Sequence, residues 1–173
     1  FYFAMYLSQW PCSLIQYMAE IHSKIKEIDP VWGKIRVEAE AAVENEPLLG
    51  ALLHKNILQH DSIDMALAHR ISLKLSSLEM SEQYLREFCN RSFREDSTLA
   101  ESARADIMAT FDRDPACHRF LQPLLYFKGF QAVQAYRVGN FMWRHGKRDM
   151  AYFLQSRVSE VFGIDIHPGA IIG

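Results

Sequence analysis

Two aspartates stand in short motifs that could do chemistry: Asp114 in "RDPA" and Asp165 in "DIHP". A carboxylate can orient an imidazole that acts as a general base, or hold the ammonium group of a substrate. Asp165 and His167 are two residues apart and would share one face of an extended strand. Each aspartate also has a structural interpretation. Asp114 before Pro115 predicts a helix N-cap, and Asp165 could cap a turn. The residues alone leave both interpretations open.

Other reactive side chains give weaker signals. The histidines contain no i, i+4 pair and no cysteine at ligand spacing, so a metal site is not expected. They are His22, His54, His60, His69, His118, His145 and His167. No general base is evident for Cys117, which is not expected to be a nucleophile. Three widely spaced cysteines indicate reduced thiols in a cytosol-like compartment.

Composition excludes several partners. The 173 residues are 49% hydrophobic and 23% charged, with a net charge of −2 and no block of Lys or Arg. A nucleic-acid surface and a polybasic membrane patch are therefore not expected. The aromatic stretch from Tyr126 to Trp143 is interpreted as a packing face and not as a platform for stacking bases. Lys128 and Arg137 within it could join this stretch to a following domain or could be solvated.

Residues 1–28 are an N-terminal extension of uncertain status. The run "FYFAMYLSQWPCSLIQYM" lacks a basic segment and is interrupted by polar residues, so it fits neither a secretory signal nor a membrane span. One hypothesis is that the natural start lies at or near Met18 and that residues 1–17 are unrelated to the fold. An ordinary N-terminal helix is the alternative.

From Asp29 onward, caps and helix breakers predict an α-helical domain of seven or eight helices, with no strand before residue 164. Helices are expected after Asp29-Pro30, Pro47, Asp61-Ser62, Ser81, Ser97 and Asp114-Pro115, then over 123–146 and 147–162. Ile63, Leu67, Ile71 and Leu75 form one apolar stripe. In the last helix Met150, Phe153, Leu154, Val158, Val161 and Phe162 are expected on one face, with Gly163 ending the helix.

The ending "GIDIHPGAIIG" follows a different periodicity. Ile166 and Ile172 are six residues apart, with Pro168, Gly169 and Ala170 between them. An aliphatic residue every six positions, with small residues at the corners, is typical of a left-handed β-helix. A single period is weak evidence, and on the residues alone a buried loop with two isoleucines is favoured.

Longer runs resemble a known family. The segments "DPVWGKIRVEAEAAVENEPLLGALLHKNILQH", "DMALAHRISLKLS" and everything from "RDPACHRF" to "DIHPGAIIG" closely resemble bacterial and plant serine acetyltransferases. The resemblance covers about residues 29 to 173. It implies a mainly α chain, with a helical domain at 29–163 and the first side of a left-handed parallel β-helix (hexapeptide repeat) at 164–173. The chain then looks like a fragment.

The resemblance also implies an activity, the transfer of acetyl from the co-substrate acetyl-CoA to the hydroxyl of L-serine in cysteine biosynthesis. Asp165 is implied to orient a general-base histidine that lies beyond residue 173, and Asp114 to contact the serine amino group. His167 then becomes a structural residue of the turn. No residue is assigned to acetyl-CoA, and no permanent cofactor or metal is implied. A trimer-based homo-oligomer, docking of the full-length protein to O-acetylserine sulfhydrylase and a cytoplasmic location are implied as well.

Two alternatives are a helical oligomerisation module without activity of its own, and another hexapeptide-repeat acyltransferase. The chain as given is expected to be inactive, because it lacks the general base, but still to associate. Its terminal isoleucines (Ile164, Ile166, Ile171 and Ile172) are expected to be exposed or disordered.

Overall fold

The computed structural model describes residues 29–172, and within them the chain is helical without any strand. The prediction of a mainly α fold is confirmed. The hypotheses on residues 1–28 lie outside the described residues. The elements in chain order are α3 (Pro30–Asn45), the 3-10 turn η1 (Pro47–Leu49), α4 (Gly50–Leu53), the π-helical turn η2 (His54–Leu58), α5 (Ile63–Leu75), α6 (Glu82–Glu95), α7 (Thr98–Arg113), α8 (Leu121–Tyr126), α9 (Lys128–Arg144) and α10 (Arg148–Phe162).

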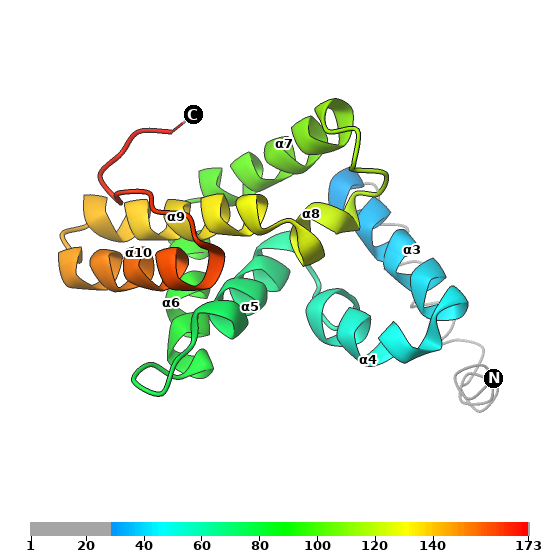
Figure 1. Cartoon of the computed structure of the whole chain (residues 1–173), viewed down its shortest axis with the longest axis horizontal. Coiled ribbons are helices and arrows are strands. Elements are labelled where there is room, and N and C mark those ends of the chain that lie inside the picture. The colour runs from blue at the N-terminus through cyan, green and yellow to red at the C-terminus, as the bar shows by residue number, and fades with distance from the viewer. Residues whose placement is uncertain (1–28, 173) are drawn as a thin grey trace.

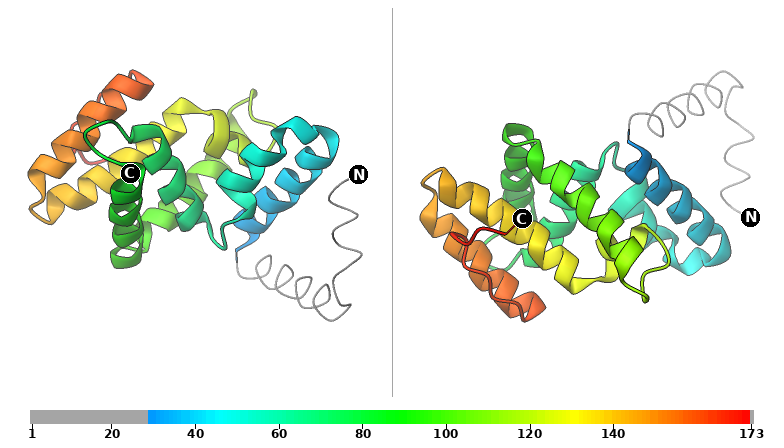
Figure 2. Two further views of the ribbon diagram at one scale, coloured as in Figure 1. Left: turned by 90° about the horizontal axis from the view of Figure 1, so that it is seen from below. Right: turned by 90° about the horizontal axis from the view of Figure 1, so that it is seen from above.

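These helices form an elongated body (Figure 1). The antiparallel pair α9 and α10 occupies one end, and α3 and α4 occupy the other. α5 packs along α6 between them. Views from above and below show α7 running from the end of α6 toward α3 (Figure 2). The chain then turns back through α8. The C-terminal segment folds back over α10 and α9, so its position is set by those two helices.

The predicted start of α3 is confirmed. The Oδ1 atom of Asp29 accepts a hydrogen bond from the backbone N of Trp32 at 3.0 Å, with Pro30 at the first helical position. Its Oδ2 atom accepts a bond from Nε of Arg104 at 2.8 Å. One carboxylate therefore caps α3 and also ties it to α7.

The predicted stripe on α5 is confirmed as core. Ile63, Leu67, Ile71 and Leu75 are all buried. Burying such side chains contributes roughly 1.5–3 kcal/mol each, so this stripe is a main source of stability for the packing of α5.

Helices begin directly after Ser62 and Ser97, as predicted. Neither serine side chain caps its helix, so the predicted cap at Ser62 was wrong. At α7 the backbone N of Thr98 donates to Oδ1 of Asp96 at 3.1 Å. Asp96, and not Ser97, therefore accepts from a free N–H at the start of the helix. Ser81 does cap α6, through a bond of 3.4 Å from the backbone N of Tyr84.

The long helix predicted over 123–146 is broken at Phe127, whose backbone is extended (φ −88°, ψ 102°). Side chains satisfy the carbonyls that the break leaves open. The side-chain amide of Gln131 donates to the carbonyl of Leu124 at 2.9 Å, and Arg70 donates to that of Leu125 at 2.6 Å. The break is stable because these distant donors replace the missing helical bonds.

The last helix, α10, ends as predicted. Gly163 is left-handed (φ 68°), which a glycine adopts without strain. The predicted face was partly wrong: Leu154, Val158 and Phe162 are buried, but Val161 is 37% exposed. Ala151, at i−3 from Leu154, completes the buried face instead.

Candidate functional site

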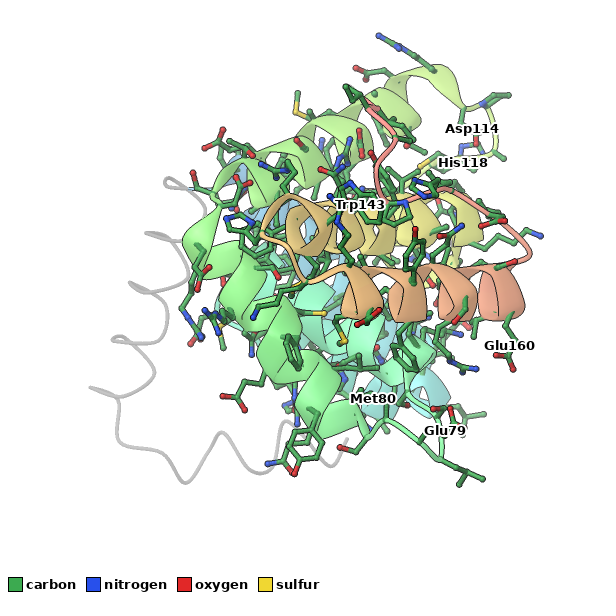
Figure 3. The ribbon with its side chains drawn as sticks, turned by 90° about the vertical axis from the view of Figure 1, so that its left-hand side faces the viewer. Glu79, Met80, Asp114, His118, Trp143 and Glu160 are labelled. Atoms are coloured by element: carbon green, nitrogen blue, oxygen red, sulfur yellow. The ribbon has the colours of Figure 1, made fainter. Side chains whose placement is uncertain are left out.

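Asp114 lies on the loop that joins α7 to α8 (Figure 3), and the prediction that it forms the N-cap of a following helix was wrong. No helix begins at Pro115, and the next one begins at Leu121. A proline disfavours a helical backbone in the residue before it, so Asp114 is extended (ψ 111°) and ends α7. Its Oδ1 atom accepts from the backbone N of Ala116 at 2.9 Å, which fixes the turn. Oδ2 is left for another partner.

The Asp114 loop forms one wall of an open groove of about 960 Å³. The C-terminal end of α7 and the junction of α8 with α9 contribute most of the lining. Lys128 lies at the start of α9 in this groove and is exposed. The groove also includes Ile172, from the C-terminal segment. Asp114 and the end of the chain therefore border the same space, although they are 58 residues apart in sequence (172 − 114).

A polar network joins α7 and α9 at the groove. Arg137, nearly buried, forms an ion pair with Asp106 of α7. The side-chain amide of Gln134 donates to Oδ2 of Asp106 at 2.8 Å, and its oxygen accepts from Arg137 at 3.2 Å. Arg137 is therefore not simply solvated. It fixes the two helices that form the groove.

Cys117, three residues after Asp114, is buried and its thiol donates weakly to the carbonyl of Arg119. Burial raises the pKa of this thiol, and the nearby carboxylates of Asp114 and Glu38 raise it further. A thiol that stays protonated is a poor nucleophile. The structure therefore offers no support for thiol chemistry at this loop.

Asp165 stands in the C-terminal segment just after α10. Its Oδ1 atom accepts a hydrogen bond from the side-chain amide of Gln155 at 2.7 Å. His167 has different partners: its Nδ1 accepts from the backbone N of Gly169 at 3.0 Å, and its carbonyl accepts from Ala170. The side chains of Asp165 and His167 are therefore held by different groups. His167 occupies a structural position in the turn.

Helix α9 holds this segment through polar side chains one turn apart. The side-chain amide of Asn140 donates to the carbonyls of Pro168 (2.8 Å) and Ala170 (3.2 Å). The hydroxyl of Tyr136 donates to the same carbonyl of Ala170. These three bonds fix the path of the chain after Asp165.

An aromatic cluster holds the turn from its other side. The ring of Trp143 on α9 packs edge-on against His167 at 5.0 Å and against Tyr152 of α10 at 5.4 Å. Gly169 lies so close that a Cβ there would be 3.0 Å from Nε1 of Trp143. Only glycine fits this approach without displacing the indole.

The terminal isoleucines follow the expected exposure only in part. Ile171 is 99% and Ile172 is 44% exposed, but Ile164 packs against the core and Ile166 is half-buried. The expectation for these two was wrong because the segment folds back over α9 and α10.

Gln155, Asn140, Tyr136 and the Asp106–Arg137 pair were not identified from the sequence. Tyr136, Asn140 and Trp143 do have an i, i+4, i+7 spacing that places them on one helix face. This shared face of two polar side chains and one indole was the feature of the sequence from which a contact surface could have been predicted. Gln155 had none, because its partner lies ten residues ahead across a helix end.

Among residues 29–172, no three His, Cys, Asp or Glu side chains gather as metal ligands would. Within the same range, no helix is long and apolar enough to cross a membrane.

Comparison with known proteins decides the family. The family model for the N-terminal region of serine acetyltransferase matches residues 31–135. The chain belongs to the serine acetyltransferase family. The serine acetyltransferase of Escherichia coli (strain K12) is 41% identical to it over 148 residues, which are 86% of this chain and 54% of that protein. The chain thus spans about half the length of this curated relative.

Solved structures of the family agree with the fold. A serine acetyltransferase in complex with CoA superposes with a TM-score of 0.82 at 38% identity, covering 83% of this chain and 61% of that one. The serine acetyltransferase of Neisseria gonorrhoeae in complex with serine gives a TM-score of 0.78 at 43% identity, covering 80% of this chain and 57% of that one. The helical arrangement is therefore that of the family.

Proposed function

We propose that this chain is the N-terminal part of a serine O-acetyltransferase, which transfers acetyl from acetyl-CoA to the hydroxyl of L-serine in the cytoplasm. One observation of the structure supports this most directly. Ile172, which follows Asp165 by seven residues (172 − 165), borders the same groove as Asp114. The two segments that bear the aspartates of the family motifs therefore approach one space. Relatives solved with serine and with CoA are consistent with these two substrates.

The reaction needs a base and a positioned amine. A serine hydroxyl is a poor nucleophile at neutral pH, so a histidine must take its proton as the oxygen attacks the thioester carbonyl. We assign that histidine to the part of the protein after residue 173. Asp165 would accept from the far side of its imidazole and stabilise the imidazolium that forms. Acetyl-CoA supplies the activated acyl group, and its thiolate leaves as CoA.

Asp114 would hold the serine ammonium group. Its Oδ1 atom is engaged by the backbone of the turn, so the carboxylate is fixed in direction, while Oδ2 can accept from a substrate. A charge-assisted bond to a pre-oriented carboxylate sets the register of the hydroxyl relative to the base. The loop therefore gives Asp114 two roles, one in the turn and one toward substrate.

We further propose that residues 164–173 are the first side of a left-handed β-helix. The protein would form a trimer-based homo-oligomer, in which the helical domain joins trimers into a larger assembly. The full-length protein would dock to O-acetylserine sulfhydrylase. These proposals rest on membership of the family.

The test is an assay on the longest reading frame that contains this chain. Purified protein is mixed with acetyl-CoA and L-serine, and thiol release is followed with a chromogenic thiol reagent. Release that depends on L-serine is expected, with none above background for L-alanine, which lacks the hydroxyl. Release that is the same with either amino acid would be hydrolysis and would refute the proposed transfer.

A further inference from the structure

Gln155 is the one side chain within residues 29–172 that makes a hydrogen bond to the carboxylate of Asp165. It stands on α10 next to the buried Leu154, and it is itself half-buried. Its backbone is therefore fixed by the core packing of α10. The bond of 2.7 Å is at the short end of the range for an N–H donor.

The backbone around Asp165 is fixed at both ends. Before it, Gly163 ends α10, and Ile164 packs against the core. After it, Asn140 holds the carbonyl of Pro168. The Asp165 side chain itself is exposed and could rotate about its own bonds. The bond from Gln155 restricts that rotation.

The type of donor matters for the chemistry. A carboxylate that orients an imidazole must remain charged and keep one oxygen free. The amide of Gln155 occupies Oδ1 and leaves Oδ2 open. A lysine or arginine there would offset the negative charge of the carboxylate and make the paired imidazole a weaker base. A neutral amide orients the carboxylate without that loss.

We propose that Gln155 is a positioning residue for Asp165, holding its carboxylate so that Oδ2 faces the imidazole of the general base. This inference rests on the proposed function. It differs from a merely structural role, in which the bond would only tie the C-terminal segment to α10.

The experiment compares three variants of the whole enzyme. Gln155→Met keeps the length and helix propensity but removes the donor. Gln155→Lys restores a donor and adds a positive charge. Gln83→Met is the matched control, because Gln83 is an exposed glutamine on α6. For each, kcat, KM for L-serine, the pH profile of kcat/KM and the melting temperature are measured.

Gln155→Met is expected to lower kcat roughly tenfold, as loss of an outer hydrogen-bond partner commonly does, with KM for serine within twofold. Gln155→Lys is expected to recover only part of kcat, because it restores the donor but weakens the base, and to move the acid limb of the profile to lower pH because a cation beside Asp165 makes the imidazole less basic. Gln83→Met should match the unaltered enzyme.

Two results would overturn the inference while leaving the proposed function intact. One is an unchanged kcat in Gln155→Met. The other is a fall in kcat that accompanies a lower melting temperature and is not recovered by Gln155→Lys, which indicates a structural tie only. If the unaltered enzyme itself shows no serine-dependent release, the proposed function fails instead.

Discussion

A buried pair of histidines makes the stability of the helical domain depend on pH. His60 follows η2 and His69 lies on α5, with ring centroids 5.1 Å apart and residue exposures of 7% and 1%. Burial lowers the pKa of both imidazoles below 6.5. The Nε2 atom of His69 is buried without a hydrogen-bond partner. The neutral forms are therefore the ones that the fold accommodates.

Several charges face this pair, and their effects oppose one another. Glu82 lies 3.3 Å from Nδ1 of His69 and favours its protonation, but Arg86 from the same helix disfavours it. Asp61 favours protonation of His60, whereas Arg36 disfavours it. The charge of Lys55 disfavours protonation of His69. The backbone carbonyl of Lys55 lies 3.2 Å from Nε2 of His60 and accepts a hydrogen bond from it. The loss of hydration outweighs the two carboxylates, so both pKa values stay lowered.

The sign and size of the effect follow from linkage. Below pH 6.5 the unfolded chain binds protons on these histidines that the folded chain does not, so the free energy of unfolding falls as the pH falls toward the folded-state pKa values. Each histidine can contribute a slope of at most about 1.4 kcal/mol per pH unit. The pair can contribute up to about 2.7 kcal/mol per unit, a large part of the stability of an ordinary domain.

The measurement is urea unfolding of the 173-residue chain from pH 8 to pH 5.5, above the range in which most carboxylates titrate. A plateau above pH 7 and a fall below 6.5 are expected. His69→Gln should flatten that fall by up to about 1.4 kcal/mol per pH unit. His54→Gln is the control, because His54 is exposed on η2 and its ring is solvated in both states. A fall of the same slope in His69→Gln and the control would refute the reasoning.

Four further changes test other contacts. Asp114→Asn in the whole enzyme should raise KM for serine roughly ten- to hundredfold while the protein still folds, as loss of a charge-assisted contact predicts; unchanged kinetics would remove Asp114 from the site. Asp165→Asn should depress kcat more than KM, because it disturbs an imidazole that is charged only during the reaction; weaker serine binding with intact turnover would place it in the substrate pocket. Asp106→Ala should destabilise by about 2 kcal/mol, more than Arg137→Met, because it leaves a buried guanidinium unpaired; equal losses in urea unfolding would contradict this. Gly169→Ala should speed amide exchange at Ala170 roughly tenfold at an unchanged melting temperature, since the added Cβ displaces the indole beside it; unchanged exchange would show that the indole gives way freely.

The sequence predicted the helices well where the cause is local. The cap at Asp29, the stripe on α5 and the stop at Gly163 depend on residues a few positions apart. The break at Phe127 was missed because its donors come from elsewhere. Arg70 on α5 donates to α8 across 55 residues (125 − 70). The residue pattern of the broken segment gives no indication of a donor so distant in the sequence.

The candidate site also combines features that local sequence predicts with features that depend on distant residues. Asp114 and Asp165 were chosen through family motifs, and their roles toward substrate remain predictions. Their surroundings could not be predicted: the turn at Asp114 depends on how Pro115 ends α7, and the contact of Asp165 depends on how the chain folds back after α10. Both are consequences of chain reversal, which side-chain periodicity does not encode.

The contacts of α9 suggest why the segment after residue 163 can be ordered at all. In a β-helix each coil is stabilised by its neighbours, so the first coil lacks a partner on one side and requires a cap. If residues 164–173 are the first side of such a coil, α9 would be that cap. Asn140 and Tyr136 take the carbonyls of Pro168 and Ala170, which an adjoining strand would otherwise take. The segment that bears Asp165 is then positioned by the helical domain, and the geometry of the site depends on helices that contribute no reacting group.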